Sequence, residues 1–221
     1  IQCVALLRDR GEVLLASSTS SEVRTWARGA ARDGFGSLAL AEQHSSLCLH
    51  LTEGPLGREM LVGLHGGVAA RAVDGGATER ARLDHGDAAV MCLASDGDCV
   101  VTGGDDGVVC VWSRARLACL HRALDAHADV VRSVALRGAT LVSGSLDDTL
   151  RIWDLHAHPR ELASHPASHA RCVMCVDTVH HEAMVFAVAV GDGYVVSSSG
   201  GGRVHVWRMR DAADHACAHV C

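Results

Sequence analysis

Lysine does not occur in this chain of 221 residues, in which all 20 basic residues are arginines. The phosphate-binding P-loop needs a lysine that reaches the nucleotide phosphates, so this class of nucleotide site is excluded. We attribute the arginine-only usage to a codon bias toward GC-rich triplets. The formal net charge of −6 further argues against nucleic-acid binding, which calls for a basic surface.

The chain also lacks sustained helical periodicity and an apolar run of membrane-spanning length. The best candidate run, residues 172–190, is interrupted by four polar residues, Asp177, His180, His181 and Glu182. The first segment, "IQCVALLRDR", carries no basic residue ahead of its apolar stretch, as a secretory leader would. We therefore expect no membrane insertion and a location in the cytoplasm or the nucleus.

No catalytic motif is complete. The string "GFGSLA" at 34–39 matches a dinucleotide fingerprint, but no buried strand precedes it and no helical pattern follows. His181 and Glu182 begin a zinc-protease motif, yet Val185 stands where the second histidine is needed. We therefore expect no enzyme activity, no catalytic residues and no cofactor.

Ten cysteines are scattered mostly through strand-like segments, without the dense spacing of small disulfide-rich secreted domains. We interpret most of them as reduced thiols. Cys172 and Cys175 form a C-x-x-C pair, but residues three apart on a strand point to opposite faces, which argues against a metal or redox role. A zinc site stays open as an alternative in the C-terminal tail, where four soft ligands alternate: His215, Cys217, His219 and Cys221.

What the chain does contain is a repeated segment. "VVTGGDDGVVCVW" ends at Trp112, and "TLVSGSLDDTLRIWD" ends one residue after Trp153. The chain has four tryptophans, Trp26, Trp112, Trp153 and Trp207. If the step from Trp112 to Trp153 is taken as one unit, the step from Trp26 to Trp112 corresponds to two units. The step from Trp153 to Trp207 then corresponds to one unit with an insertion. A period of about 40 residues is typical of β-propeller blades.

Each unit consists of short strand-like runs joined by tight turns. Runs such as "VRSVAL" and "TLRIW" place alternate side chains on one face, which is strand periodicity, and the links between them are rich in Gly and Asp. A single four-stranded blade has open edges and an apolar face that it cannot cover alone. Blades must therefore stack around an axis to bury these surfaces.

The unit from His127 to Asp154 contains, in order, a His, the strand "VVRSVAL", the strand "TLVSGS", the turn "LDD" and the segment "TLRIWD". In these elements the chain resembles the WD-repeat family of β-propellers. The resemblance implies an all-β fold, a β-propeller of four-stranded antiparallel blades. We expect about five blades in residues 1–221, as a portion of a ring of about seven, with a closed five-blade ring as the alternative. The predicted blades, called units one to five below, are 1–42, 43–84, 85–122, 123–165 and 166–221.

In this family a His, a Ser or Thr, an Asp and a Trp at fixed offsets hold each blade together. The resemblance assigns these roles to His85, Thr102, Asp106 and Trp112 in unit three, and to His127, Ser143, Asp147 and Trp153 in unit four. A neutral imidazole can donate to the Asp and accept from a hydroxyl whose other partner is the indole N–H. Because the hydroxyl is expected on a blade strand, we interpret these residues as structural and not as a hydrolytic triad.

The other three units depart from this pattern. Unit one lacks both the hydroxyl and the Asp. Unit two has no Trp, and an alignment on its glycines places Gly66 at the Asp position and Ala72 at the Trp position. Unit five, taken to begin at His169, keeps Ser197 but has Gly201 in place of the Asp.

The resemblance also implies an interaction function, because one face of such propellers usually receives a peptide or a protein. We predict a non-enzymatic scaffold that binds other proteins or peptides. On this face units three and four are expected to present Asp84, Asp87, Asp105, Asp125, Asp129, Arg132 and Leu146. Most of these side chains are acidic, so we expect partners that bear Arg or Lys. A solvated acidic rim without a binding role is the alternative.

Two other functions stay open. The narrower one is the substrate-recognition module of a ubiquitin ligase, although no F-box lies in these residues. The other belongs to a different class: a propeller enzyme that uses the axial channel, or a zinc-binding protein that uses the C-terminal His/Cys tail.

Overall fold

The computed structural model describes residues 3–9, 12–18, 22–28, 34–39, 48–54, 57–72, 79–97, 99–114, 116, 118–123, 126–155, 174–209 and 217–220, with most side chains described from residue 48 onward. These residues form antiparallel sheets. Among them there is no helix, and hence none long and apolar enough to cross a membrane. The all-β prediction is confirmed.

Three of the sheets have four strands each, ordered as in the sequence. The first sheet contains β1 (Cys3–Asp9), β2 (Glu12–Ser18), β3 (Glu22–Arg28) and β4 (Gly34–Ala39). The second contains β11 (Val131–Arg137), β12 (Thr140–Ser145), β13 (Thr149–Asp154) and β14 (Met174–His180). The third contains β15 (Val185–Gly191), β16 (Tyr194–Ser199), β17 (Val204–Arg208) and β18 (Cys217–Val220).

The remaining sheet has six strands and joins two units. Its strands are β5 (Cys48–Gly54), β6 (Gly57–Ala72), β7 (Glu79–Asp96), β8 (Cys99–Gly104), β9 (Val109–Ser113) and β10 (Ala118–Ala123). β7 belongs to both units, because residues 79–84 pair with β6 and residues 90–96 pair with β8. β6 likewise changes partner, from β5 at residues 57–63 to β7 at residues 65–71. The register with β7 shifts at Gly66, whose φ of 84° is one that glycine adopts readily.

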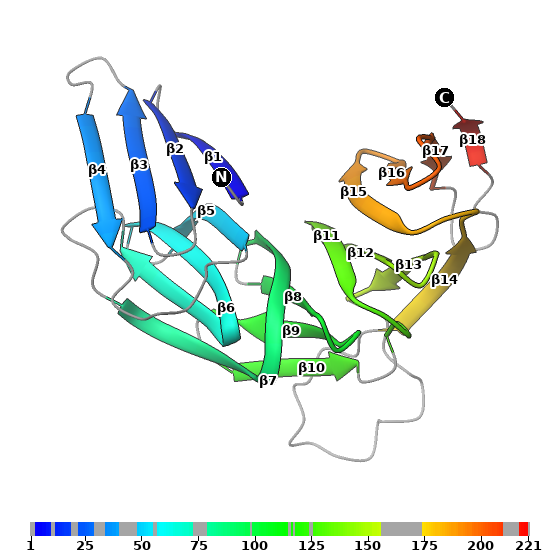
Figure 1. Ribbon diagram of the computed structural model, residues 1–221, viewed down its shortest axis with the longest axis horizontal. Coiled ribbons are helices and arrows are strands. Elements are labelled where there is room, and N and C mark those ends of the chain that lie inside the picture. Colours follow the sequence, from blue (N-terminus) through cyan, green and yellow to red (C-terminus); the bar gives the residue numbers. More distant parts are fainter. Residues whose placement is uncertain are drawn as a thin grey trace.

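The first strands of the units lie side by side around a common axis. β1 packs beside β5, β5 beside β7, β7 beside β11 and β11 beside β15. Figure 1 shows the sheets following one another along an arc, with the first and last sheets at its two ends. This is the arrangement of propeller blades in an open portion of a ring.

One sheet divides the chain differently from the predicted boundary at 165–166. β14 pairs with β13, so residues 174–180 are the outer strand of unit four, whereas the prediction placed them in unit five. The difference arises because the long connection 156–173 separates these paired strands in the sequence and hides the pairing from a count of repeats. The other blade boundaries stay predictions.

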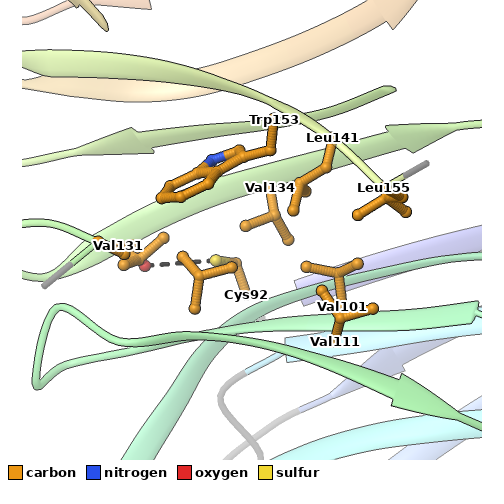
Figure 2. Packing of buried hydrophobic residues seen from close by; sticks show 10 residues of the cluster. Cys92, Val101, Val111, Val131, Val134, Leu141, Trp153 and Leu155 are labelled. Carbon is orange, nitrogen blue, oxygen red and sulfur yellow. Dashed lines mark hydrogen bonds between the residues drawn. The ribbon is translucent and has the colours of Figure 1, made fainter. Parts of the chain in front are cut away.

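Apolar side chains fill the layer between units three and four (Figure 2). The Cys92 thiol donates to the Val131 carbonyl oxygen at 3.3 Å across this layer. Burial raises the pKa of Cys92 to about 12, so this thiol acts as an apolar packing group. The buried members are Cys92, Val101, Val109, Val111, Ala126, Val131, Val134, Leu141, Trp153 and Leu155.

Each tryptophan whose side chain is described faces the unit before its own. Trp112 packs with Val68 of unit two, Trp153 belongs to the layer of Figure 2, and Trp207 packs with Val142 of unit four. An indole buries roughly 150–250 Å², so these contacts are a large part of what joins neighbouring blades.

The last sheet leaves an apolar face exposed. Val204 occupies the same pairing position in β17 of unit five as Leu150 occupies in β13 of unit four. Leu150 is fully buried against unit five, whereas Val204 is 39% exposed, and Met184 and Phe186 of the same sheet are also exposed. This open sheet fits the expected portion of a larger propeller.

Candidate functional site

The units meet at one end of the sheets, which we call the loop end. Here the chain enters the first strand of each unit and turns between the second and third strands. The His127 N–H donates to the Gly107 carbonyl at 3.1 Å, and the His181 N–H donates to the Asp148 carbonyl at 2.8 Å. The turn of one unit is thus hydrogen-bonded to the loop that leads into the next.

In unit four the four blade residues form one continuous series of hydrogen bonds, which we call the relay. The Trp153 indole N–H donates to Ser143 Oγ at 2.9 Å, and Ser143 Oγ lies 2.7 Å from His127 Nε2. His127 Nδ1 lies 3.1 Å from Asp147 Oδ2. Since Trp153, Ser143 and His127 are all buried, the relay connects the blade core to the loop end.

The Asp147 carboxylate has further donors. It accepts from the Ala128 N–H at 2.9 Å, the Thr149 N–H at 3.0 Å and the Thr149 hydroxyl at 2.6 Å. Burial alone would raise the pKa of Asp147, but these hydrogen bonds and the facing imidazole lower it below 3.8. Burial lowers the pKa of His127 below 6.5 despite the opposing effect of Asp147. At neutral pH the pair is therefore a neutral imidazole that donates to a carboxylate.

In unit three the corresponding relay is interrupted at the histidine. The Trp112 indole N–H donates to Thr102 Oγ1 at 2.9 Å. His85 is fully buried, yet within the described structure neither ring nitrogen makes a hydrogen bond. Its ring lies 6.3 Å from the Trp112 ring, centroid to centroid. The structure brings Thr102 and Trp112 together and does not bond His85 to Thr102 or Asp106.

The residue after the histidine is also bonded differently in the two units. In unit four the residue after the histidine donates its N–H to the Asp carboxylate. In unit three that residue is Gly86, and its N–H donates to Asp84 Oδ1 at 2.8 Å instead. Asp106 accepts the Val108 N–H at 3.1 Å and lies 3.8 Å from the Arg122 guanidinium.

Unit five contains a third relay, and its histidine is His181. The Trp207 indole N–H donates to Ser197 Oγ at 2.8 Å, and Ser197 Oγ lies 3.1 Å from His181 Nε2. His169, at which we expected this unit to begin, lies outside the described residues. The sequence signal for His181 is its spacing from the Ser and the Trp of its unit, which equals the spacing of His127 in unit four.

In unit two the position of the tryptophan is held by Arg71. Gly66 and Gly107 both have positive φ, 84° and 76°, and Trp112 stands five positions after Gly107. Five positions after Gly66 is Arg71, which is buried. The structure therefore shifts the predicted alignment, which had placed Ala72 there, by one residue.

The carboxylates predicted to meet a partner are exposed at the loop end. Asp84 Oδ1, Asp105 Oδ1 and Asp129 Oδ1 each accept a backbone N–H. The donors are Gly86 at 2.8 Å, Ala89 at 2.9 Å and Val130 at 2.6 Å. These three side chains are held by the loops and still face solvent.

The other predicted partner residues differ in exposure. Asp87 and Arg132 are exposed, and Leu146 is half-buried, with its N–H donating to the Val130 carbonyl at 3.1 Å. Asp125 lies outside the described residues.

The four residues of the tail that were kept open as an alternative zinc site lie outside the residues whose side chains are described, although β18 pairs with β17 at the edge of the last sheet. Within the described part of the chain, no three His, Cys, Asp or Glu side chains come together as a metal site would require. Among the described cysteines, Cys48, Cys92, Cys99, Cys110 and Cys119 have reduced thiols, and Cys119 is exposed.

Comparison with known protein families and proteins identifies the repeat. The family "WD domain, G-beta repeat" matches residues 78–113 and 118–154. Cell division control protein 4 of Saccharomyces cerevisiae is 28% identical over 132 residues, covering 56% of this chain and 17% of that protein. The p21-activated protein kinase-interacting protein 1-like of Danio rerio is 37% identical over 81 residues, covering 35% of this chain and 22% of that protein. The chain thus spans less than a quarter of these relatives.

Solved structures agree on the fold. The WD40 beta propeller domain of Doa1 matches with a TM-score of 0.72 and 17% identity, over 100% of this chain and 67% of that one. The computationally designed Ika8 protein matches with a TM-score of 0.71 and 19% identity, over 98% of this chain and 60% of that one. This chain thus contains two repeats of the WD family, residues 78–113 and 118–154, and its antiparallel sheets have the WD40 β-propeller fold.

Proposed function

We propose that this chain is a non-enzymatic protein-interaction module whose loop end binds a partner segment rich in Arg or Lys. The observation that carries the proposal is the group of exposed carboxylates at the loop end: Asp84, Asp87, Asp105 and Asp129. We call this group the acidic rim.

The acidic rim is pre-organised. Three of its carboxylates accept a backbone N–H from the loops beside them, so the loops hold them before a partner arrives. A carboxylate that is already positioned loses little conformational entropy when it binds, which favours charge-assisted hydrogen bonds to Arg or Lys. Half-buried Leu146 lies in the neighbouring turn and supplies an apolar contact for the stem of such a side chain.

The relatives support an interaction role at a coarser level. The Danio rerio relative is described as a protein kinase-interacting protein, so a chain with similar repeats acts through contact with another protein. The same role is proposed here for a different and unidentified partner.

The test compares two matched variants. The rim variant carries Asp84→Asn, Asp87→Asn, Asp105→Asn and Asp129→Asn, in which the amide oxygen can still accept the loop N–H groups. The control variant carries Asp96→Asn and Asp192→Asn at the hairpin turns of the opposite end, where Asp96 accepts the Gly138 N–H and Asp192 pairs with Arg137. Proteins captured from a native lysate are identified by mass spectrometry, and basic segments of those partners are then titrated.

We expect the rim variant to lose the partner, with affinity reduced at least about tenfold for loss of two or more charged hydrogen bonds, and the control to keep it. The salt dependence of binding should also weaken in the rim variant. Equal affinity and equal salt dependence in all three proteins would assign the acidic rim to solvation only.

The ubiquitin-ligase role is a narrower form of this proposal. It predicts that ligase subunits are captured together with the chain and that the captured substrates are lost with the acidic rim. Capture of partners without any ligase subunit would favour the general scaffold.

A further inference from the structure

We propose that unit five binds a carboxylate group from outside its own sheet, at the turn of residues 199–203. This group would take the place beside His181 that the Asp147 carboxylate takes beside His127 in unit four. The site is separate from the acidic rim and does not rest on the function proposed for it.

The imidazoles of the two units are held in the same way. His181 Nε2 lies 3.1 Å from Ser197 Oγ, which also accepts the Trp207 indole N–H at 2.8 Å. In unit four the corresponding distances are 2.7 and 2.9 Å. Because one nitrogen of each ring faces the serine, the other nitrogen, Nδ1, faces the turn at the loop end.

The turn has the same backbone in both units. The Gly200 N–H donates to the Met184 carbonyl at 2.8 Å, as the Leu146 N–H donates to the Val130 carbonyl at 3.1 Å. Five positions before the tryptophan, Gly202 has a φ of 73° where unit four has 64°. The position of the Asp carboxylate in unit four therefore has a direct counterpart in unit five.

That counterpart has room for a side chain because its residue is Gly201. A Cβ at Gly201 would meet only Ser199 Oγ, at 4.0 Å, and a Cβ at Gly202 would meet nothing within 4 Å. His181 Nδ1 is buried and has no hydrogen-bond partner within the described structure. Unit five thus keeps the donor of the relay and lacks the acceptor.

The hydrogen bonds of the relay determine what kind of group is missing beside His181. Ser197 Oγ accepts the indole N–H, so its own hydrogen is available to His181 Nε2, and the neutral imidazole then carries its proton on Nδ1. Burial, followed by the nearby His205, lowers the pKa of His181, which favours this neutral form at pH 7. A buried N–H donor calls for an acceptor, and in unit four that acceptor is a carboxylate.

The surroundings supply further donors and also competing charges. By position, the N–H groups of Glu182 and Arg203 correspond to the two N–H groups that hold Asp147 in unit four. The Arg203 guanidinium forms an exposed ion pair with Glu182, whose side chain is 77% exposed and so lies outside the site. Asp148 is the other nearby carboxylate, and its charge opposes that of an incoming ligand.

The test follows the His181 ring nitrogens by NMR while the full chain is titrated with sodium acetate against sodium chloride at equal ionic strength. The matched variant is Gly201→Asp, which places a carboxylate in the site from within; Gly201 is not in the left-handed region, so Asp fits without strain. The control variant is Gly191→Asp, which adds the same charge in open space at the opposite end of β15.

We expect a saturable shift of His181 Nδ1 in the wild type and in Gly191→Asp, and binding at least about tenfold weaker in Gly201→Asp. Gly201→Asp should also raise the melting temperature by about 2–4 °C, because it completes the buried relay. No saturable shift, or equal shifts in Gly201→Asp, would overturn the proposal.

A second arm separates a free carboxylate from an acidic side chain of a protein. An unstructured peptide with one central Asp is compared with its Asn counterpart. Tighter binding of the Asp peptide than of acetate assigns the site to an acidic segment of a partner, and equal binding assigns it to small carboxylates. Equal binding of the Asp and Asn peptides, with no acetate effect, would contradict the proposal.

Discussion

At the scale of single residues, the same four-residue pattern gives two different structures. Asp147 accepts four hydrogen bonds, including that of His127, whereas Asp106 accepts the Val108 N–H and leaves His85 unbonded within the described structure. Nearly identical residue types, with Thr102 in the place of Ser143, at nearly identical spacing therefore differ in how much they stabilise their blades.

Removing the two carboxylates should reveal this difference. Asp147→Ala leaves several buried donors unsatisfied, and we expect it to reduce the free energy of unfolding by about 1–3 kcal/mol or more. Asp106→Ala removes one neutral-donor hydrogen bond and should cost less than about 1.5 kcal/mol. Urea unfolding followed by tryptophan fluorescence measures both. A larger loss for Asp106→Ala would mean that the relay of unit three does form in solution.

The sequence predicted the members of these relays and not their bonding. The His, hydroxyl and Trp positions follow from spacing, and the spacing of unit four would also have identified His181. In unit three His85 has no hydrogen bond within the described structure, and the Gly86 N–H donates to Asp84 instead of Asp106. The residue types and their spacing do not predict this difference.

At the scale of the elements, the turns between second and third strands combine two constraints. Each needs a residue with positive φ five positions before the tryptophan, and these residues are Gly107, Asp148 and Gly202 in units three to five. At Gly107 the turn also packs tightly against the next unit, because a Cβ there would lie 2.3 Å from the His127 carbonyl oxygen. Gly202 has open space around it.

Alanine substitutions should separate these constraints. Gly202→Ala meets only the backbone strain, about 1 kcal/mol, since nothing lies within 4 Å of its Cβ. Gly107→Ala adds the clash with the next unit, and we expect a clearly larger loss, about 2–4 kcal/mol. Thermal unfolding compares the two variants. Equal losses would show that the contact between turn and loop is easily relaxed.

Strand existence was easier to predict than strand pairing. Alternating runs and Gly/Asp turns predicted the hairpins of units three and four, which the structure contains as β7 to β9 and β11 to β13. The outer strand of unit four was missed because the long connection 156–173 places it beyond the expected repeat length. Pairing across a long connection is determined by tertiary packing and leaves no local signal.

At the scale of the whole molecule, buried histidines recur from unit to unit. His50, His85, His127 and His181 all have a pKa lowered below 6.5, in each case mainly through burial. The folded chain therefore holds them neutral at a pH where the unfolded chain begins to take up protons. The stability of the described part of the molecule is coupled to pH through all four.

Acidification should consequently destabilise the fold in a defined window. Because the folded-state pKa values are depressed, the contribution of these histidines is complete above about 6.5 and is lost progressively as pH falls below that value. The contribution of Asp147 follows only below 3.8, where its own depressed pKa is approached. We expect the urea midpoint to fall steadily as the pH is lowered from about 6.5 to about 5.5. A flat or rising midpoint over this range would contradict the assignment of neutral, buried imidazoles.

The continuity of β7 determines how this protein can be dissected. Its residues 79–96 complete unit two and begin unit three, so a fragment cut at the predicted boundary of 84–85 would divide one strand between two pieces. Each piece would keep its own strand pairing but would expose the apolar cluster in which Val68 of unit two packs with Trp112 of unit three, which favours aggregation. Units two and three are therefore best expressed and mutated together, and a fragment boundary after β10 keeps both intact.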